Sequence, residues 1–136
     1  MMYSQISPSD NVDQILVERI QSLFIDKLGH QPEDVYCRFL DNKLTIVIEN
    51  AITKPEKLLM AAGYQEIVEK ARSSIEKILQ PDFKLLIEEV TNSQVSNILF
   101  ATHLDTNYVS IIALFADNYK LTSNKKLQLT EDSVSN

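Results

Sequence analysis

Residues 35–49, VYCRFLDNKLTIVIE, contain two alternating apolar runs joined by Asp41-Asn42. Both linking residues tolerate positive φ, so the stretch predicts a β-hairpin with a tight turn. In that register, one face is expected to carry Val35, Cys37, Phe39, Leu44, Ile46 and Ile48, and the other Tyr36, Arg38, Lys43 and Thr45. One apolar face and one mixed face are typical of a sheet that packs on helices from one side. Cys37 falls on the apolar face and is expected to be a buried, inert thiol.

Amphipathic helices are predicted before and after this hairpin. Apolar residues recur at helical spacing over residues 11–28, and Gly29 is a natural helix end. After the hairpin, Thr53 and Glu56 have the spacing of a capping box, which predicts a short helix that begins with KPEK.

A second long apolar stripe follows and predicts a third helix. It comprises Tyr64, Ile67, Val68, Ala71, Ile75, Ile78 and Leu79. Pro81 is expected to break or kink this helix, because proline cannot donate a backbone hydrogen bond and disfavours a helical residue before it. The apolar pattern then indicates that the helix resumes to about Thr91.

Two further strands are predicted over residues 94–104 and 107–116, with a turn at Asp105-Thr106. One face would carry Ile98, Phe100, Val109, Ile111, Ala113 and Phe115, and the opposite face Leu99, Ala101, Ile112 and Leu114, with His103 and Tyr108 near the turn. Both faces are apolar, and the protein's own helices can cover only one. Because large exposed apolar patches usually mark interfaces, we expect a partner subunit on the other face and hence a homodimer.

Together these elements predict an α+β domain in the order α-ββ-α(α)-ββ, with a four-stranded, mainly antiparallel sheet of two β-hairpins packed against the helices. Residues 1–10 are expected to be an N-terminal extension, and residues 11–117 a single domain. Residues 118–136 are polar and only weakly periodic, which favours a mobile C-terminal tail.

The composition excludes several classes of function. A net charge of −6 and a pI near 4.8 argue against a nucleic-acid binder and give no general attraction to anionic lipid. One cysteine excludes an intrachain disulfide and suits a reducing cytoplasm. The start of the chain does not have the pattern of a signal peptide, and the longest apolar run, VSIIALFA, is far shorter than the roughly 20 residues of a membrane span. We therefore expect a cytoplasmic protein with no direct membrane span.

His103 and Asp105 are the most suggestive pair of chemical groups in the chain. They could share a metal ion or a proton, but a zinc site needs three or four ligands, and the remaining histidine and thiol are His30 and Cys37. The simpler interpretation is that Asp105 shapes the turn and that His103 is a surface residue beside it. Only two glycines are present, so neither a phosphate loop nor a dinucleotide fingerprint is possible. No catalytic residue, metal or cofactor is predicted.

A possible anion site comprises four basic residues, His30, Arg38, Lys54 and Lys57, near the start of the KPEK helix. The helix dipole would assist such binding. The competing interpretation is that exposed basic residues serve solubility.

The order of the motifs resembles the MpsC-like family, named after a proposed sodium-translocating, membrane-potential-generating system. The segments that carry the resemblance are GHQP, VYCRFLDNKLTIVIENAITKPEKLL, LQPDFKLLIEEVTN and THLDTNYVSIIALF, which together extend over about residues 10 to 116. The family's "L-T-P-x-E"-like segment corresponds to Thr53, Pro55, Glu56 and Leu59, although here Lys54 separates the threonine from the proline. No established catalytic residue of the family carries over.

The resemblance implies a non-enzymatic accessory or regulatory protein of a membrane ion or bicarbonate transport system. Such a protein would act at the inner face of the membrane by binding an integral membrane partner. The interface residues predicted for it are Leu99, Tyr108, Ile112 and Leu114; the mixed sheet face and the tail are its candidate contact surfaces. One alternative is a small-molecule or anion sensor that acts as a homodimer. A third is an enzyme that uses His103 and Asp105.

Overall fold

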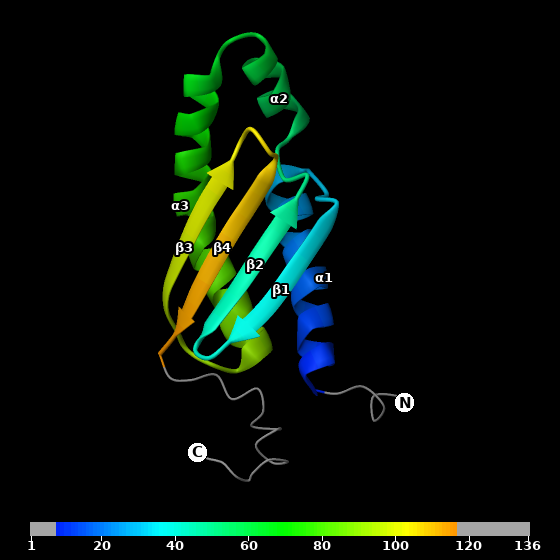
Figure 1. Cartoon of the computed structure of the whole chain (residues 1–136), viewed down its shortest axis with the longest axis vertical. Coiled ribbons are helices and arrows are strands. Elements are labelled where there is room, and N and C mark those ends of the chain that lie inside the picture. The colour runs from blue at the N-terminus through cyan, green and yellow to red at the C-terminus, as the bar shows by residue number, and fades with distance from the viewer. Residues whose placement is uncertain (1–7, 117–136) are drawn as a thin grey trace.

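The computed structural model describes residues 8–116 and has three helices and four strands (Figure 1). They are α1 (Pro8–Leu28), β1 (Asp34–Leu40), β2 (Lys43–Glu49), α2 (Lys54–Ala61), α3 (Gln65–Thr91), β3 (Val95–His103) and β4 (Tyr108–Phe115). The predicted α+β fold is therefore confirmed. α1 begins at Pro8 rather than at residue 11, and it ends as predicted, with Gly29 at a φ of 63°. The expected N-terminal extension lies mostly, and the C-terminal tail entirely, outside the described residues.

The four strands form one antiparallel sheet in the order β1-β2-β4-β3, so the two hairpins join through β2 and β4. The predicted registers are confirmed: Cys37 lies opposite Ile46 and Phe100 lies opposite Ile111. The first turn is the expected two-residue link, with Asp41 at positive φ. The second turn has four residues, 104–107, centred on the predicted pair.

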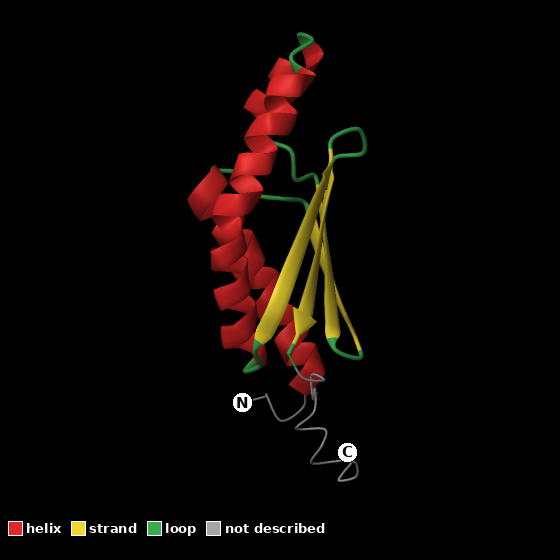
Figure 2. Cartoon of the chain, turned by 90° about the vertical axis from the view of Figure 1, so that its left-hand side faces the viewer, coloured by secondary structure: helices red, strands yellow, loops and turns green. Residues whose placement is uncertain are grey.

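All three helices lie on the same side of the sheet (Figure 2). The core between the two layers includes the fully buried Leu16, Ile20, Leu44, Ile46, Ile48, Phe83, Ile87, Ile111 and Ala113. Phe83 connects the layers, because its ring meets Phe24 of α1 at 6.4 Å and Phe100 of β3 at 5.2 Å, both edge to face. This geometry is the favourable one for aromatic pairs.

α3 continues through Pro81 without a break, contrary to the break that proline predicts. Pro81 is exposed, while Leu79 and Phe83 on either side of it are buried against the core. Burial of large apolar side chains stabilises each by about 2 kcal/mol, so packing on both sides of the proline offsets the lost backbone hydrogen bond.

The predicted apolar stripe of α3 was right at Val68, Ile75 and Leu79, which are buried or pack against the core, and wrong at its other large members. Tyr64, Ile67 and Ile78 are more than half exposed. The buried residues of the helix are Val68, Arg72, Leu79, Phe83, Leu86, Ile87 and Thr91. A charged residue therefore occupies a core-facing position, and a pattern of apolar residues alone does not find it.

Candidate functional site

Within residues 8–116, one face of the sheet has no helix over it, and we call its outward side chains the open face (Figure 2). Directly opposed residues of antiparallel strands point to the same side, so the registers define its members. They are Asp34, Tyr36, Arg38 and Leu40 of β1; Lys43, Thr45, Val47 and Glu49 of β2; Tyr108, Ser110, Ile112 and Leu114 of β4; and Asn97, Leu99, Ala101 and His103 of β3. Figure 1 shows this face toward the viewer.

The β3–β4 half of the open face is mainly apolar. Leu99 lies opposite Ile112, and their side chains are 51% and 36% exposed. Tyr108 and Leu114 are half-buried on the same face. The structure thus brings the four sequence-predicted interface residues together on one surface. Contiguous exposed apolar side chains are typical of a surface that contacts another protein.

The β1–β2 half is charged, and the two signs lie at opposite ends of the strands. Arg38 and Lys43 lie toward the turn at residues 41–42. At the other end, the carboxylates of Glu33, Asp34 and Glu49 lie within 4.8 Å of one another. Such exposed acidic groups are common without a bound ion, so we assign none.

The acidic end affects the tyrosines beside it. Asp34 and then Glu49 raise the pKa of Tyr36, because negative charge disfavours the phenolate. The hydroxyl of Tyr108 donates to a carboxylate oxygen of Glu49 at 3.5 Å. This end of the open face is therefore a region of negative potential.

The structure gathers only part of the predicted anion site. His30 Nε2 lies 2.6 Å from the carbonyl oxygen of Asn50, and Lys57 Nζ lies 3.4 Å from the side-chain oxygen of the same residue. Lys54 is the exposed first residue of α2. Arg38 lies apart, on the open face, about 13 Å along β1 from the end of that strand that pairs with Glu49.

The N-terminus of α2 is capped by its own residues, as the capping box predicted. The backbone N–H of Glu56 donates to Thr53 Oγ1 at 3.4 Å, and the backbone N–H of Thr53 donates to Glu56 Oε1 at 2.8 Å. These groups are the ones that would bind an anion at a helix N-terminus. Because these groups are hydrogen-bonded to one another, they are less available to bind an anion at this helix end.

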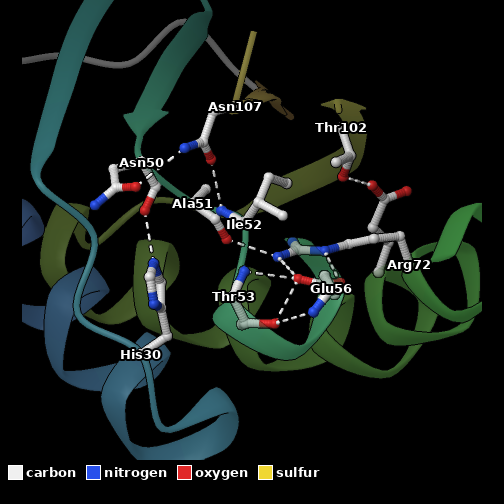
Figure 3. Close-up of polar contacts among 10 residues, drawn as sticks. His30, Asn50, Ala51, Ile52, Thr53, Glu56, Arg72, Thr102 and Asn107 are labelled. Atoms are coloured by element: carbon white, nitrogen blue, oxygen red, sulfur yellow. Dashed lines mark hydrogen bonds and ion pairs between the residues drawn. The ribbon is translucent and has the colours of Figure 1, made fainter. Parts of the chain in front are cut away.

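A buried ion pair holds α2 against α3 (Figure 3). Arg72 is 4% exposed, and its Nε and Nη2 donate to the two carboxylate oxygens of Glu56 at 2.6 and 2.9 Å. Nη2 also donates to the carbonyl oxygen of Ala51 at 2.6 Å. Bidentate pairing of this kind fixes geometry as well as charge. The signal missed in the sequence is that Arg72 lies one helical turn after the buried Val68.

Asn107 ties the β3–β4 turn to the chain that leaves β2 (Figure 3). It has a φ of 64°, its side-chain oxygen accepts from the backbone N–H of Ile52 at 2.8 Å, and its side-chain nitrogen donates to Asn50 at 3.0 Å. Asparagine is among the few residues that enter the left-handed region readily. Together with Arg72, it positions the acidic end of the open face.

His103 is the last residue of β3, and within residues 8–116 no hydrogen bond joins its side chain to Asp105. His103 Nε2 lies 3.4 Å from Ser110 Oγ on the exposed face, a pairing that sequence spacing did not suggest. Among residues 8–116, no carboxylate is recorded in a hydrogen bond with this imidazole, so the third member of a catalytic triad is not in place. Asp105 lies in the turn, as predicted.

A cleft of about 570 Å³ lies between the first half of α3 and the β3–β4 turn. Its charged lining includes Glu69, Glu76 and Asp105, and Thr102 Oγ1 donates to Glu76. The cleft thus presents more carboxylates than free cationic groups, because the Arg72 that lines it is paired with Glu56.

No helix within residues 8–116 combines the length and apolar character that crossing a membrane would require.

Comparison with known proteins gives one match. The family model described as Na+-translocating membrane potential-generating system (MpsC) matches residues 9–117. No curated protein and no solved structure matches the chain.

Proposed function

The chain belongs to the MpsC family of the Na+-translocating membrane potential-generating system, and from that membership we propose that it is a non-enzymatic accessory component of this membrane ion-transport system. The resemblance expected from the sequence motifs is confirmed. The observation that carries the proposal is the match over residues 9–117, almost the whole described domain. In this proposal the protein acts at the inner face of the membrane through contact with an integral component.

We further propose that the working form is a homodimer that covers the open face. Leu99 and Ile112 support this, because they are large, apolar, exposed and adjacent on neighbouring strands. Burying such side chains is favourable by about 25 cal/mol for each Å² removed from water.

The accessory role is tested by affinity capture of the tagged full-length chain from native cells, after mild crosslinking and with membranes included. We expect reproducible recovery of an integral ion-transport subunit with the wild-type chain and with Leu85→Asp, a control at an exposed apolar position of α3. Recovery of the chain alone would contradict the accessory role.

A small-molecule sensor is the second candidate, and the cleft beside α3 favours it. The carboxylates of Glu69, Glu76 and Asp105 suit a cation or an amine better than an anion. A ligand that binds only the folded state raises the melting temperature, so thermal-shift titration with an organic diamine, bicarbonate and phosphate separates the cases. A shift with the diamine that is lost in Glu69→Gln would support a sensor. No shift with any of the three would contradict it.

A further inference from the structure

Apolar character and charge vary in perpendicular directions on the open face. Across the strands, β3 and β4 carry the apolar side chains and β1 and β2 the charged ones. Along the strands, Lys43 lies at the basic end of β2 and Glu49 at its acidic end. We propose that a second copy of the chain occupies this face with its strands antiparallel to those of the first, so that each basic end meets the partner's acidic end. This geometry rests on the proposed homodimer and specifies how the two copies meet.

Two stacked sheets with aligned strands can be related by a two-fold axis in two ways. An axis parallel to the strands would place the β1–β2 half of one copy over the β3–β4 half of the other. Lys43 would then face the partner's Leu114, and Arg38 would face the partner's Leu99. Burial of these charges against apolar side chains, without an opposite charge, is costly.

An axis across the strands places each half over the same half of the partner. The three registers align Cys37, Ile46, Ile111 and Phe100 in one row at the middle of the sheet, so the axis crosses every strand near its centre. Lys43 and Glu49 lie three residues to either side of that row on β2. Lys43 therefore meets the partner's Glu49, and the reverse contact forms at the other end.

The same axis also sets the other contacts of the open face. Leu99 meets the partner's Ala101 and Leu114 meets the partner's Tyr108, whereas Ile112 meets the partner's Ser110 and Leu40 meets the partner's Asp34. Arg38 lies over the partner's Tyr36, a favourable arrangement of a guanidinium with an aromatic ring. The two Lys43–Glu49 contacts, which the axis parallel to the strands lacks, therefore favour this orientation.

The open face measures about 19 by 23 Å, from four strand spacings and seven residue rises. This is a small interface compared with the roughly 800 Å² that each partner buries in a standard complex. We therefore expect a dimer of modest affinity, in which two equivalent charge contacts have a measurable effect.

Charge reversal tests the orientation directly. Lys43 and Glu49 of one chain are about 20 Å apart along β2, which is beyond the screening length at physiological salt. Any coupling between these two residues must therefore act between copies. The variants are Lys43→Glu, Glu49→Lys and the double variant, with Lys70→Glu on the exposed side of α3 as the control.

Dimer dissociation constants are measured by analytical ultracentrifugation of the full chain at physiological salt. We expect each single reversal to weaken dimerisation about tenfold, and the double variant to return to within about threefold of the wild type, because opposite charges face each other again. The Lys70→Glu control is expected to dimerise like the wild type.

The outcomes separate the orientation from the dimer itself. A double variant weaker than both single variants, or single variants that dimerise like the wild type, would overturn the antiparallel orientation and leave the homodimer. A wild-type chain that remains monomeric up to about 1 mM would overturn the homodimer and, with it, this geometry.

A distance measurement keeps the test independent of the charge variants. Nitroxide labels at Lys43→Cys, in a Cys37→Ala background, are expected about 22 Å apart across the antiparallel dimer, from the strand rise and the spacing of stacked sheets. The axis parallel to the strands predicts about 11 Å instead. Spectra that show the shorter distance would overturn the orientation.

Discussion

Arg72 is the single residue with the greatest expected effect on stability. It is buried and donates to both carboxylate oxygens of Glu56 and to the carbonyl oxygen of Ala51. Arg72→Met leaves the carboxylate buried without its partner, so we expect the free energy of unfolding in urea to fall by about 3–5 kcal/mol at pH 7.

The matched control is Arg19→Met. Arg19 also pairs with a glutamate, Glu89, at 2.7 Å, but the two side chains are 46% and 53% exposed. Exposed ion pairs contribute about 1 kcal/mol or less, so this variant should unfold nearly like the wild type. Equal losses in the two variants would show that burial of the Arg72 pair has no energetic consequence.

Glu56 makes stability depend on pH. Burial by itself raises the pKa of this carboxyl, but hydrogen bonds from Arg72 and Thr53 and the charge of Arg72 outweigh it and hold the pKa below its ordinary value. Stability from such a group is complete above the unfolded pKa of about 4.3 and is lost as the pH falls through the folded pKa.

We therefore compare the free energy of unfolding of Glu56→Gln with that of the wild type across pH. The wild type is expected to be more stable by a constant amount between about pH 7 and pH 5, and the difference should shrink below about pH 4. Chemical denaturation at each pH measures it, and contributions from other carboxylates cancel in the difference. A difference unchanged down to about pH 2 would contradict the pKa assignment.

Cys37 should be unreactive while the protein is folded. Burial and then the negative charge of Asp13 raise the pKa of its thiol to about 12. Because the thiolate is the reactive form, labelling by a disulfide reagent at pH 8 is expected to be about a thousandfold slower in buffer than in urea. Equal rates in the two solvents would mean that the thiol is open to solvent.

At the scale of elements, Pro81 lies inside α3 and leaves one backbone carbonyl without its usual donor. Pro81→Ala restores that hydrogen bond, and the greater freedom of the unfolded chain offsets part of the gain. We expect a net stabilisation of about 1–2 kcal/mol, measured as a rise in melting temperature of several degrees. Ser74→Ala, an exposed position in the same helix, should change stability by a few tenths of that amount. A lower melting temperature for Pro81→Ala would show that the proline ring itself stabilises the folded protein at this position.

The hairpins were predictable because their information is local. Alternation sets which side chains share a face, and Asp41 and the turn centred on Asp105 set the register. The pairing of β2 with β4 joins residues that are 59 to 71 positions apart, and no local pattern specifies it. Arg72 was missed for a similar reason: it belongs to the core only because Glu56, in another helix, neutralises it.

The candidate site was predictable to the same extent. Leu99 and Ile112 followed from two apolar faces on one hairpin, since helices on one side of a sheet leave the other side open. The separation of Arg38 from His30 depends on where β1 begins relative to the loop before it. The acidic cluster lies on the same hairpin, whose register places Asp34 opposite Glu49. It was therefore predictable from the sequence, although the apolar pattern alone does not indicate it.

At the scale of the whole molecule, the described part of the chain, residues 8–116, forms two layers, and none of its helices covers the outer face of the sheet (Figure 2). The buried core lies between the helices and the sheet, so the folded chain does not depend on the open face for its packing. Dimer formation and folding should therefore respond differently to a change on this face. A substitution that puts charge there tests that separation.

Leu99→Asp places a carboxylate at the apolar half of the open face, where Leu99 is 51% exposed. In a monomer the new charge remains in water and costs little, whereas in a dimer it would be buried against apolar groups. We expect the dissociation constant of the dimer to rise at least tenfold, since burial of an unpaired charge costs several kcal/mol. Melting at low protein concentration should change little, but the rise in melting temperature with concentration should disappear. Leu85→Asp, at a position of α3 that is 57% exposed, should leave both properties intact. If the two variants dimerise equally well, the open face is not where the copies meet.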